Sequence, residues 1–103
     1  MQQLPLSLDY IQQVLAEYFA DKPVKRVQVF GSYARGEATA ESDLDLLLEM
    51  KHHVGWSYFS YADELSERLG TRADVGAGVS EYMMRYIKKD LITLYDTEQK
   101  AVA

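Results

Sequence analysis

The sequence predicts a mixed α/β fold in a single domain over residues 1–103. Three observations support this prediction. The length suits one hydrophobic core and leaves no room for a separate substrate domain. The spacing of apolar residues switches several times between a helical period and strand-like alternation. No internal repeat or low-complexity segment interrupts these patterns.

Two elements are expected before residue 31. Ser7 is a suitable N-cap for a helix over about residues 8–20, in which apolar side chains recur on one side. The sequence Asp-Lys-Pro at residues 21–23 ends this helix. Residues 24–30, VKRVQVF, are rich in β-branched and aromatic residues, so they predict a strand that runs directly into Gly31.

A second strand is expected in SDLDLLLEM, residues 42–50. Its leucines at 44, 46 and 48 would face a core, whereas Asp43 and Asp45 would share the opposite face. The rest of the chain predicts four elements, which are a helix over about residues 57–69, a short strand within 71–78, a helix over about 81–90, and residues 91–96 as an edge strand or a packed tail.

The composition excludes several classes of protein. Eleven basic and sixteen acidic residues give a net charge of −5, so we expect no direct nucleic-acid binding. The absence of cysteine excludes disulfides and thiolate metal sites. The N-terminus has no basic segment before a long apolar run, and no apolar segment of about 18 residues occurs. We therefore expect a soluble, cytoplasmic protein that does not contact membranes.

Two short motifs carry the functional prediction. Gly31 and Ser32 follow the first strand directly, and a Gly-Ser turn there presents backbone N–H groups and a hydroxyl to phosphate oxygens. Asp43 and Asp45 are one residue apart on the second strand, so both carboxylates project from one face toward a shared cation. Each motif alone also fits a structural role, as a turn glycine or as a solvated strand face.

The combination of the two motifs is more specific than either. A Gly-Ser pair, ten residues and then Asp-x-Asp would occur by chance in on the order of one in a thousand chains of this length. The segments GSYARGE and SDLDLLLE resemble the nucleotidyltransferase signature of the DNA polymerase β superfamily, and are most similar to its minimal nucleotidyltransferases (MNT). The resemblance covers about residues 24–96 and implies the nucleotidyltransferase fold, a small mixed β-sheet with helices packed mainly on one face.

The resemblance also implies a third carboxylate, from a later strand with a hydrophobic-Asp-hydrophobic pattern. Ala73-Asp74-Val75 matches this pattern at a sensible distance, which makes Asp74 the candidate. The glycine-rich continuation at residues 76–78 departs from the pattern and predicts a short strand. The alternative is that Asp74 is an ordinary polar residue on an edge strand.

Roles for the site residues follow from the same resemblance. Asp43, Asp45 and Asp74 are expected to be catalytic and to bind metal, most simply two Mg²⁺ ions. Gly31 and Ser32 are expected to bind the nucleotide by holding the triphosphate tail of ATP. The cations would stabilise the negative charge that builds up when a hydroxyl attacks the α-phosphate.

Three more residues have weaker signals. Arg35 is expected to bind the nucleotide by neutralising the pyrophosphate, and the alternative is an ordinary salt bridge to Glu37 or Glu41. His52 and His53 are adjacent in a loop and have no carboxylate at ligand spacing, so we assign them no role.

An aromatic group of four residues follows the histidines. It consists of Trp56, Tyr58, Phe59 and Tyr61. Because these residues have helical spacing, their rings are expected to pack in the core or at a protein interface rather than to stack on a base. Trp56 is expected to be the most exposed of the four.

The resemblance implies a partner as well. Stand-alone proteins of this type are commonly encoded beside a HEPN-domain toxin, an RNase, and act as its antitoxin. The resemblance therefore implies that AMP from ATP is transferred to a tyrosine hydroxyl of such a toxin in a type VII-like system. Two alternatives stay open: a non-catalytic module that blocks the HEPN RNase by occlusion, and an enzyme that modifies a small molecule such as an antibiotic. The sequence leaves open the nucleotide preference, and whether the chain forms a homo-oligomer or a hetero-oligomer with the toxin.

Overall fold

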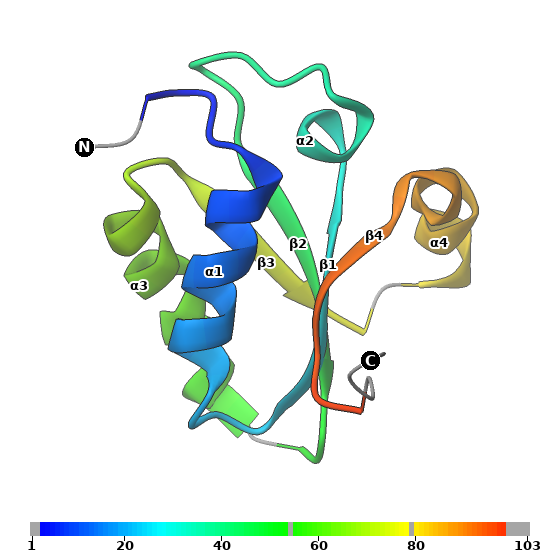
Figure 1. Ribbon diagram of the computed structural model, residues 1–103. Helices are drawn as coiled ribbons and strands as arrows, with labels where there is room; N and C mark the ends of the chain where they lie inside the picture. The colour runs from blue at the N-terminus through cyan, green and yellow to red at the C-terminus, as the bar shows by residue number, and fades with distance from the viewer. Residues whose placement is uncertain (1–2, 54, 79, 99–103) are drawn as a thin grey trace, which may run out of the picture.

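A four-stranded mixed sheet forms the centre of the molecule in the computed structural model, which describes residues 3–53, 55–78 and 80–98 (Figure 1). The strand order is β3-β2-β1-β4. β1 pairs antiparallel with β2 and with β4, whereas β2 and β3 are parallel. The strands are β1 (Val24–Phe30), β2 (Leu44–Met50), β3 (Ala73–Ala77) and β4 (Ile92–Asp96).

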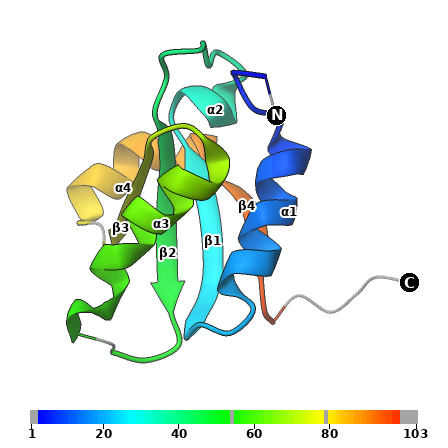
Figure 2. The same ribbon diagram turned by 90° about the vertical axis from the view of Figure 1, so that its left-hand side faces the viewer.

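The helices lie on both faces of the sheet but not equally. Two longer helices cover one face and can be seen in front of the strands in Figure 2, namely α1 (Leu8–Phe19) and α3 (Phe59–Leu69). The short helix α4 (Glu81–Ile87) lies on the other side of the sheet from them (Figure 1). The four-residue helix α2 (Ser32–Arg35) follows β1 directly. The mixed α/β architecture predicted from the sequence is confirmed.

The core lies between the sheet and the pair α1 and α3. Leu44, Leu46 and Leu48 are all buried in it, as their alternation predicted. α1 contributes Ile11 and Leu15, which are fully buried. The residues between these leucines on β2 therefore face away from the core, and this second face carries the predicted acidic residues.

Local sequence signals predicted most of the boundaries of the helices and strands. The Ser7 hydroxyl accepts a hydrogen bond from the Tyr10 N–H at 3.1 Å, which caps α1 as expected. The helix expected over about residues 57–69 starts with a 3₁₀ turn at Gly55–Tyr58, and the one expected over about residues 81–90 finishes as a 3₁₀ turn at Lys88–Asp90. Residues 91–96 were predicted as a strand or a tail, and most of them form the edge strand β4.

The aromatic residues before and within α3 divide between core and surface. Tyr61 is buried and meets Tyr18 and Phe19 edge-on, with ring centroids 5.9 Å and 5.6 Å away. Phe59 is 55% exposed and stacks on Tyr58 at 4.5 Å. The Trp56 side chain, which was predicted to be the most exposed, lies outside the described part of the chain.

No helix within the described ranges is long and apolar enough to cross a membrane.

Candidate active site

The turn after β1 has a backbone conformation that requires glycine. Gly31 has φ 74° and ψ −152°, a combination that residues with a side chain avoid. α2 begins at the next residue, and the Arg35 N–H donates to the Gly31 carbonyl at 3.1 Å. Gly36 ends α2 in the left-handed conformation, with φ 72°. The chain thus turns sharply between β1 and the loop that leads to β2.

The Asp45 carboxylate packs directly against this turn. Asp45 is the antiparallel partner of Phe30, the last residue of β1. A Cβ atom added to Gly31 would overlap Asp45 Oδ2 and lie 3.3 Å from Asp45 Cγ. Gly31 is therefore needed for two independent reasons, its φ angle and the space that the carboxylate occupies.

The structure brings the three predicted carboxylates to one end of the sheet. Asp45 on β2 and Asp74 on β3 are direct partners in the parallel register. Neighbouring strands are about 4.8 Å apart and partner side chains point to the same face, so these two carboxylates are neighbours. Asp43 lies just before β2, two residues from Asp45, and is close enough for its charge to act on Asp45.

The electrostatics of Asp45 show how closely the acidic groups interact. Its pKa is raised above the usual value, first by burial and then by the negative charges of Asp74 and Asp43. The positive charge of Arg35 acts in the opposite direction. The charge of Asp45 is thus only partly compensated by the protein itself, because Arg35 offsets less than burial and the two neighbouring aspartates add.

The donor set suits a hard divalent cation. Within the described ranges, no group of three or more Asp, Glu or His side chains is placed so that it could hold a metal ion as it stands. The neighbouring Asp45 and Asp74 carboxylates, with Asp43 beside them, nevertheless offer the oxygen ligands that Mg²⁺ prefers. A cation between them would neutralise the repulsion that raises the pKa of Asp45.

Arg35 is held beside this site by two carboxylates. Its Nε lies 2.8 Å from Glu37 Oε1, which is the salt bridge expected as the alternative role. Its guanidinium also lies 3.3 Å from Asp90 Oδ2, and Asp90 is only 16% exposed. No local pattern indicated a role for Asp90, because this contact depends on where the 3₁₀ turn after α4 lies in the fold. Glu41 instead accepts a hydrogen bond from the Thr39 hydroxyl at 3.3 Å.

Arg72 is a second basic residue near the aspartates, and the sequence analysis did not identify it. Its Nε lies 4.0 Å from Asp43 Oδ2, and its side chain is 75% exposed. Leu44 and Ala73 are register partners, so the residues that precede them lie side by side. The parallel register would have indicated this pair, but a sequence alone does not specify which residues are partners.

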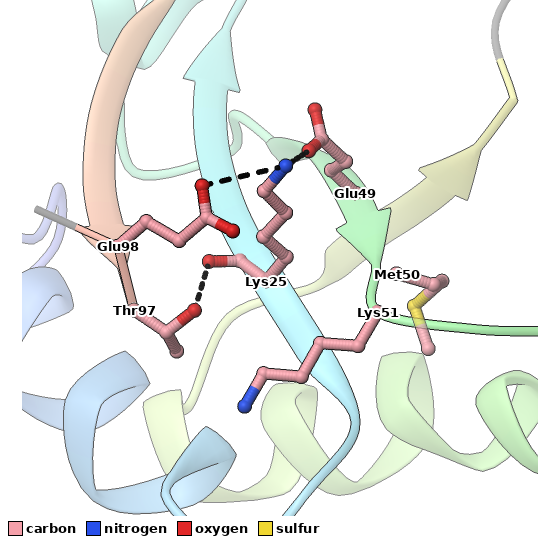
Figure 3. Close-up of a pocket in the computed structure, with 6 residues that line it drawn as sticks. All are labelled: Lys25, Glu49, Met50, Lys51, Thr97 and Glu98. Atoms are coloured by element: carbon pink, nitrogen blue, oxygen red, sulfur yellow. Dashed lines mark hydrogen bonds and ion pairs between the residues drawn. The ribbon is translucent and has the colours of Figure 1, made fainter.

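A hollow lies at the end of β1 and β2 that is remote from the aspartates (Figure 3). It has a volume of about 460 Å³, and Lys25 at its centre pairs with Glu49 at 3.0 Å and with Glu98 at 3.5 Å. Lys25 is five residues from Phe30 along β1, which corresponds to about 16 Å in a strand. The hollow is thus separate from the three aspartates, and the charge of its central lysine is already balanced.

His52 and His53 are exposed and follow the end of β2 that is remote from Asp45. His52 Nδ1 lies 3.2 Å from the carbonyl oxygen of His53. The two histidines therefore do not contribute to the cluster of aspartates.

Comparisons with known proteins agree with this geometry. The model of the nucleotidyltransferase domain family matches residues 10–100. A relative from Methanocaldococcus jannaschii, provisionally named a protein adenylyltransferase, is 40% identical over 73 residues, which are 67% of this chain and 74% of the relative. The protein adenylyltransferase MntA of Thermococcus cleftensis is 33% identical over 75 residues, with 68% and 76% of the two chains covered.

A solved structure has the same fold. It contains a tri-AMPylated HEPN toxin from Shewanella oneidensis in complex with an MNT antitoxin. The TM-score is 0.68 at 14% identity, and the match covers 88% of this chain and 74% of the other.

The family match extends over most of the chain, and the chain therefore belongs to the nucleotidyltransferase family. The prediction of a minimal nucleotidyltransferase from the Gly-Ser and Asp-x-Asp motifs is confirmed, and so is the prediction that the protein is an enzyme of this class.

Proposed function

We propose that this protein transfers AMP from ATP to a tyrosine hydroxyl of a HEPN-domain toxin and thereby silences the toxin. The observation that carries the proposal is the pairing of Asp45 with Asp74 on adjacent strands, directly against the Gly31 turn. The adenylyltransferase relatives support AMP as the transferred group. The AMPylated HEPN toxin in the structurally similar complex supports the partner.

The three aspartates would hold the divalent cations. Magnesium ions bound by Asp43, Asp45 and Asp74 would neutralise charge around the α-phosphate and lower the pKa of the attacking hydroxyl. The raised pKa of Asp45 fits this role, because the energetic cost of its unneutralised charge is removed on cation binding.

Groups of the protein itself bind the triphosphate and accept the proton. Backbone N–H groups at Gly31 and Ser32, with the Ser32 hydroxyl, bind the triphosphate tail. The Arg35 guanidinium faces the negative charge of the pyrophosphate. The acceptor oxygen forms a bond to the α-phosphorus while the bond from that phosphorus to the bridging oxygen breaks. Pyrophosphate leaves, and Asp74 accepts the hydroxyl proton.

A labelling experiment tests the proposal. The protein is incubated with Mg²⁺, ATP labelled at the α-phosphate and a purified HEPN-domain toxin. We expect label on the toxin and loss of its RNase activity, and we expect Asp45→Asn to abolish both. Asp63→Asn is the matched control, because Asp63 is exposed on α3, which covers the other face of the sheet.

The same experiment separates catalysis from occlusion. If the toxin is silenced without any label, and Asp45→Asn silences it equally well, the protein acts as a binding module and the proposal is wrong. Label on an antibiotic in the absence of any protein partner would instead identify a small-molecule enzyme.

A further inference from the structure

A second, smaller hollow lies on the face of the sheet that carries the aspartates. Its volume is about 210 Å³. Its lining residues come from β1, β2, the residue after β3 and α4, and α4 lies on the side of the sheet away from α1 and α3 (Figure 1). The residues that line it are Gln28, Leu47, Leu48, Glu49, Gly78 and Met84.

The hollow continues the line of the active site along β2. Leu47 is two residues after Asp45, so its side chain points to the same face about 6.6 Å further along the strand. Gly31 follows Phe30, the partner of Asp45, so the Gly-Ser turn lies on the opposite side of Asp45. Turn, carboxylates and hollow are therefore arranged in this order along the sheet.

Gly76 keeps the surface beside Leu47 open. It is the parallel partner of Leu47 on β3, and it is two residues after Asp74. A Cβ atom at Gly76 would meet no other atom within 4 Å. The departure from the family pattern seen at residues 76–78 thus leaves free space between Asp74 and the hollow.

The floor of the hollow is apolar although it faces away from the core. Leu47 is only 8% exposed, yet it does not belong to the main core cluster, and Met84 of α4 lines the same space. The polar groups at the rim already have partners. The Gln28 amide donates to the Thr93 hydroxyl at 3.1 Å, and Glu49 pairs with Lys25 and Arg26.

We propose that this hollow holds the aromatic ring of the acceptor tyrosine. The inference rests on the proposed function and adds a binding site to it. Displacement at phosphorus places the attacking and leaving oxygens roughly in line. If the Gly31 turn holds the leaving pyrophosphate, the attacking hydroxyl approaches from the opposite side of the aspartates, which is the side of Leu47. A leucine and a methionine form a suitable floor for an aromatic ring.

Such a ring site would favour tyrosine over serine as the acceptor. A phenol ring over Leu47 fills the apolar space and extends its hydroxyl along the strand toward Asp45 and Asp74. A serine hydroxyl has no ring to fill the hollow, so it would leave the floor exposed to water and gain no burial energy.

The first test measures binding without catalysis. The probe is p-cresol, the side-chain analogue of tyrosine, added to protein labelled with ¹³C at the methionine methyl groups and saturated with Mg²⁺ and a non-hydrolysable ATP analogue. We expect saturable shifts of the Met84 methyl resonance. We expect Gly76→Val to weaken cresol binding by about tenfold or more, because its side chain enters the space over Leu47.

Two further variants make this result specific. Gly76→Ala adds one carbon atom and should have a smaller effect than Gly76→Val. Ala16→Leu, on the exposed side of α1, adds as many carbon atoms as Gly76→Val and should bind cresol as the unmodified protein does. An unshifted Met84 resonance, or cresol binding that is equal in Gly76→Val, would overturn the inference.

A second test separates this inference from the proposed function. In the labelling assay, Gly76→Val should raise the KM for the toxin while the affinity for the Mg²⁺-bound ATP analogue changes less than about twofold. If Gly76→Val abolishes binding of the analogue instead, the hollow holds the nucleotide base and the inference is wrong. If cresol binds as expected but the unmodified protein never labels a toxin, the proposed function fails and the ring site stands.

Discussion

Asp45 shows at the scale of one residue how a functional site costs stability. Its pKa is raised in the folded protein, so the folded state binds this proton more tightly than the unfolded chain does. As the pH rises from below the usual value of 3.8 through the raised pKa, the free energy of unfolding falls, and the loss persists at neutral pH.

We therefore predict that Asp45→Asn raises the melting temperature at neutral pH when a chelator is present. The difference from the unmodified protein should shrink toward about pH 3, where Asp45 is protonated in both states. Thermal melts in EDTA across this range check the prediction. A variant that is less stable at neutral pH and equally stable in acid would contradict it.

The two glycines that flank α2 provide a matched pair of substitutions. Gly31→Ala should cost about 2–3 kcal/mol of stability, because its φ and ψ combination is almost restricted to glycine. Gly36→Ala should cost only about 1–2 kcal/mol, because its left-handed conformation is less restricted and the space around it is open.

The two variants should also differ in function. The new Cβ at position 31 would displace the Asp45 carboxylate, so Gly31→Ala should lose Mg²⁺-dependent nucleotide binding, whereas Gly36→Ala should retain it. Chemical denaturation and a nucleotide titration of both proteins measure the two effects. Equal nucleotide affinity in the two variants would show that the contact between residues 31 and 45 has no functional role.

At the scale of elements, the Arg35–Asp90 pair connects α2 with the 3₁₀ turn that follows α4. Arg35 is 43% exposed, so solvent screens the pair and it should contribute little to stability. Its main effect is expected on the orientation of the guanidinium beside the aspartates.

We predict that Asp90→Asn weakens binding of an ATP analogue by about three- to tenfold with little change in melting temperature. Glu37→Gln is the control and should have a smaller effect, because Glu37 is 65% exposed. Calorimetric titrations of both variants measure this. Tighter binding in Asp90→Asn would mean that Asp90 competes with the nucleotide for Arg35 rather than orienting it.

At the scale of the whole molecule, local patterns predicted the fold well. The alternation around Leu44 and the N-cap at Ser7 depend on neighbours in sequence, so the sequence alone was sufficient for them. The Gly-Ser and Asp-x-Asp spacing indicated the family for the same reason.

Long-range contacts could not be predicted in this way. The pairs Arg72–Asp43 and Arg35–Asp90 depend on strand register and on the position of α4, and neither follows from local spacing. The burial of Leu47 in the lining of the smaller hollow could not be predicted from the sequence for a similar reason. Its position in the alternation places it on the aspartate side, and only the packing of α4 shows that this side is partly covered.

The central claim is that carboxylates from β2 and β3 bind a metal-nucleotide complex against the Gly31 turn. The most direct measurement is a calorimetric titration with a non-hydrolysable ATP analogue, in Mg²⁺ and again in EDTA, for the unmodified protein and for Asp45→Asn. We predict saturable binding only for the unmodified protein in Mg²⁺. Binding of equal strength in EDTA, or in Asp45→Asn, would contradict the account.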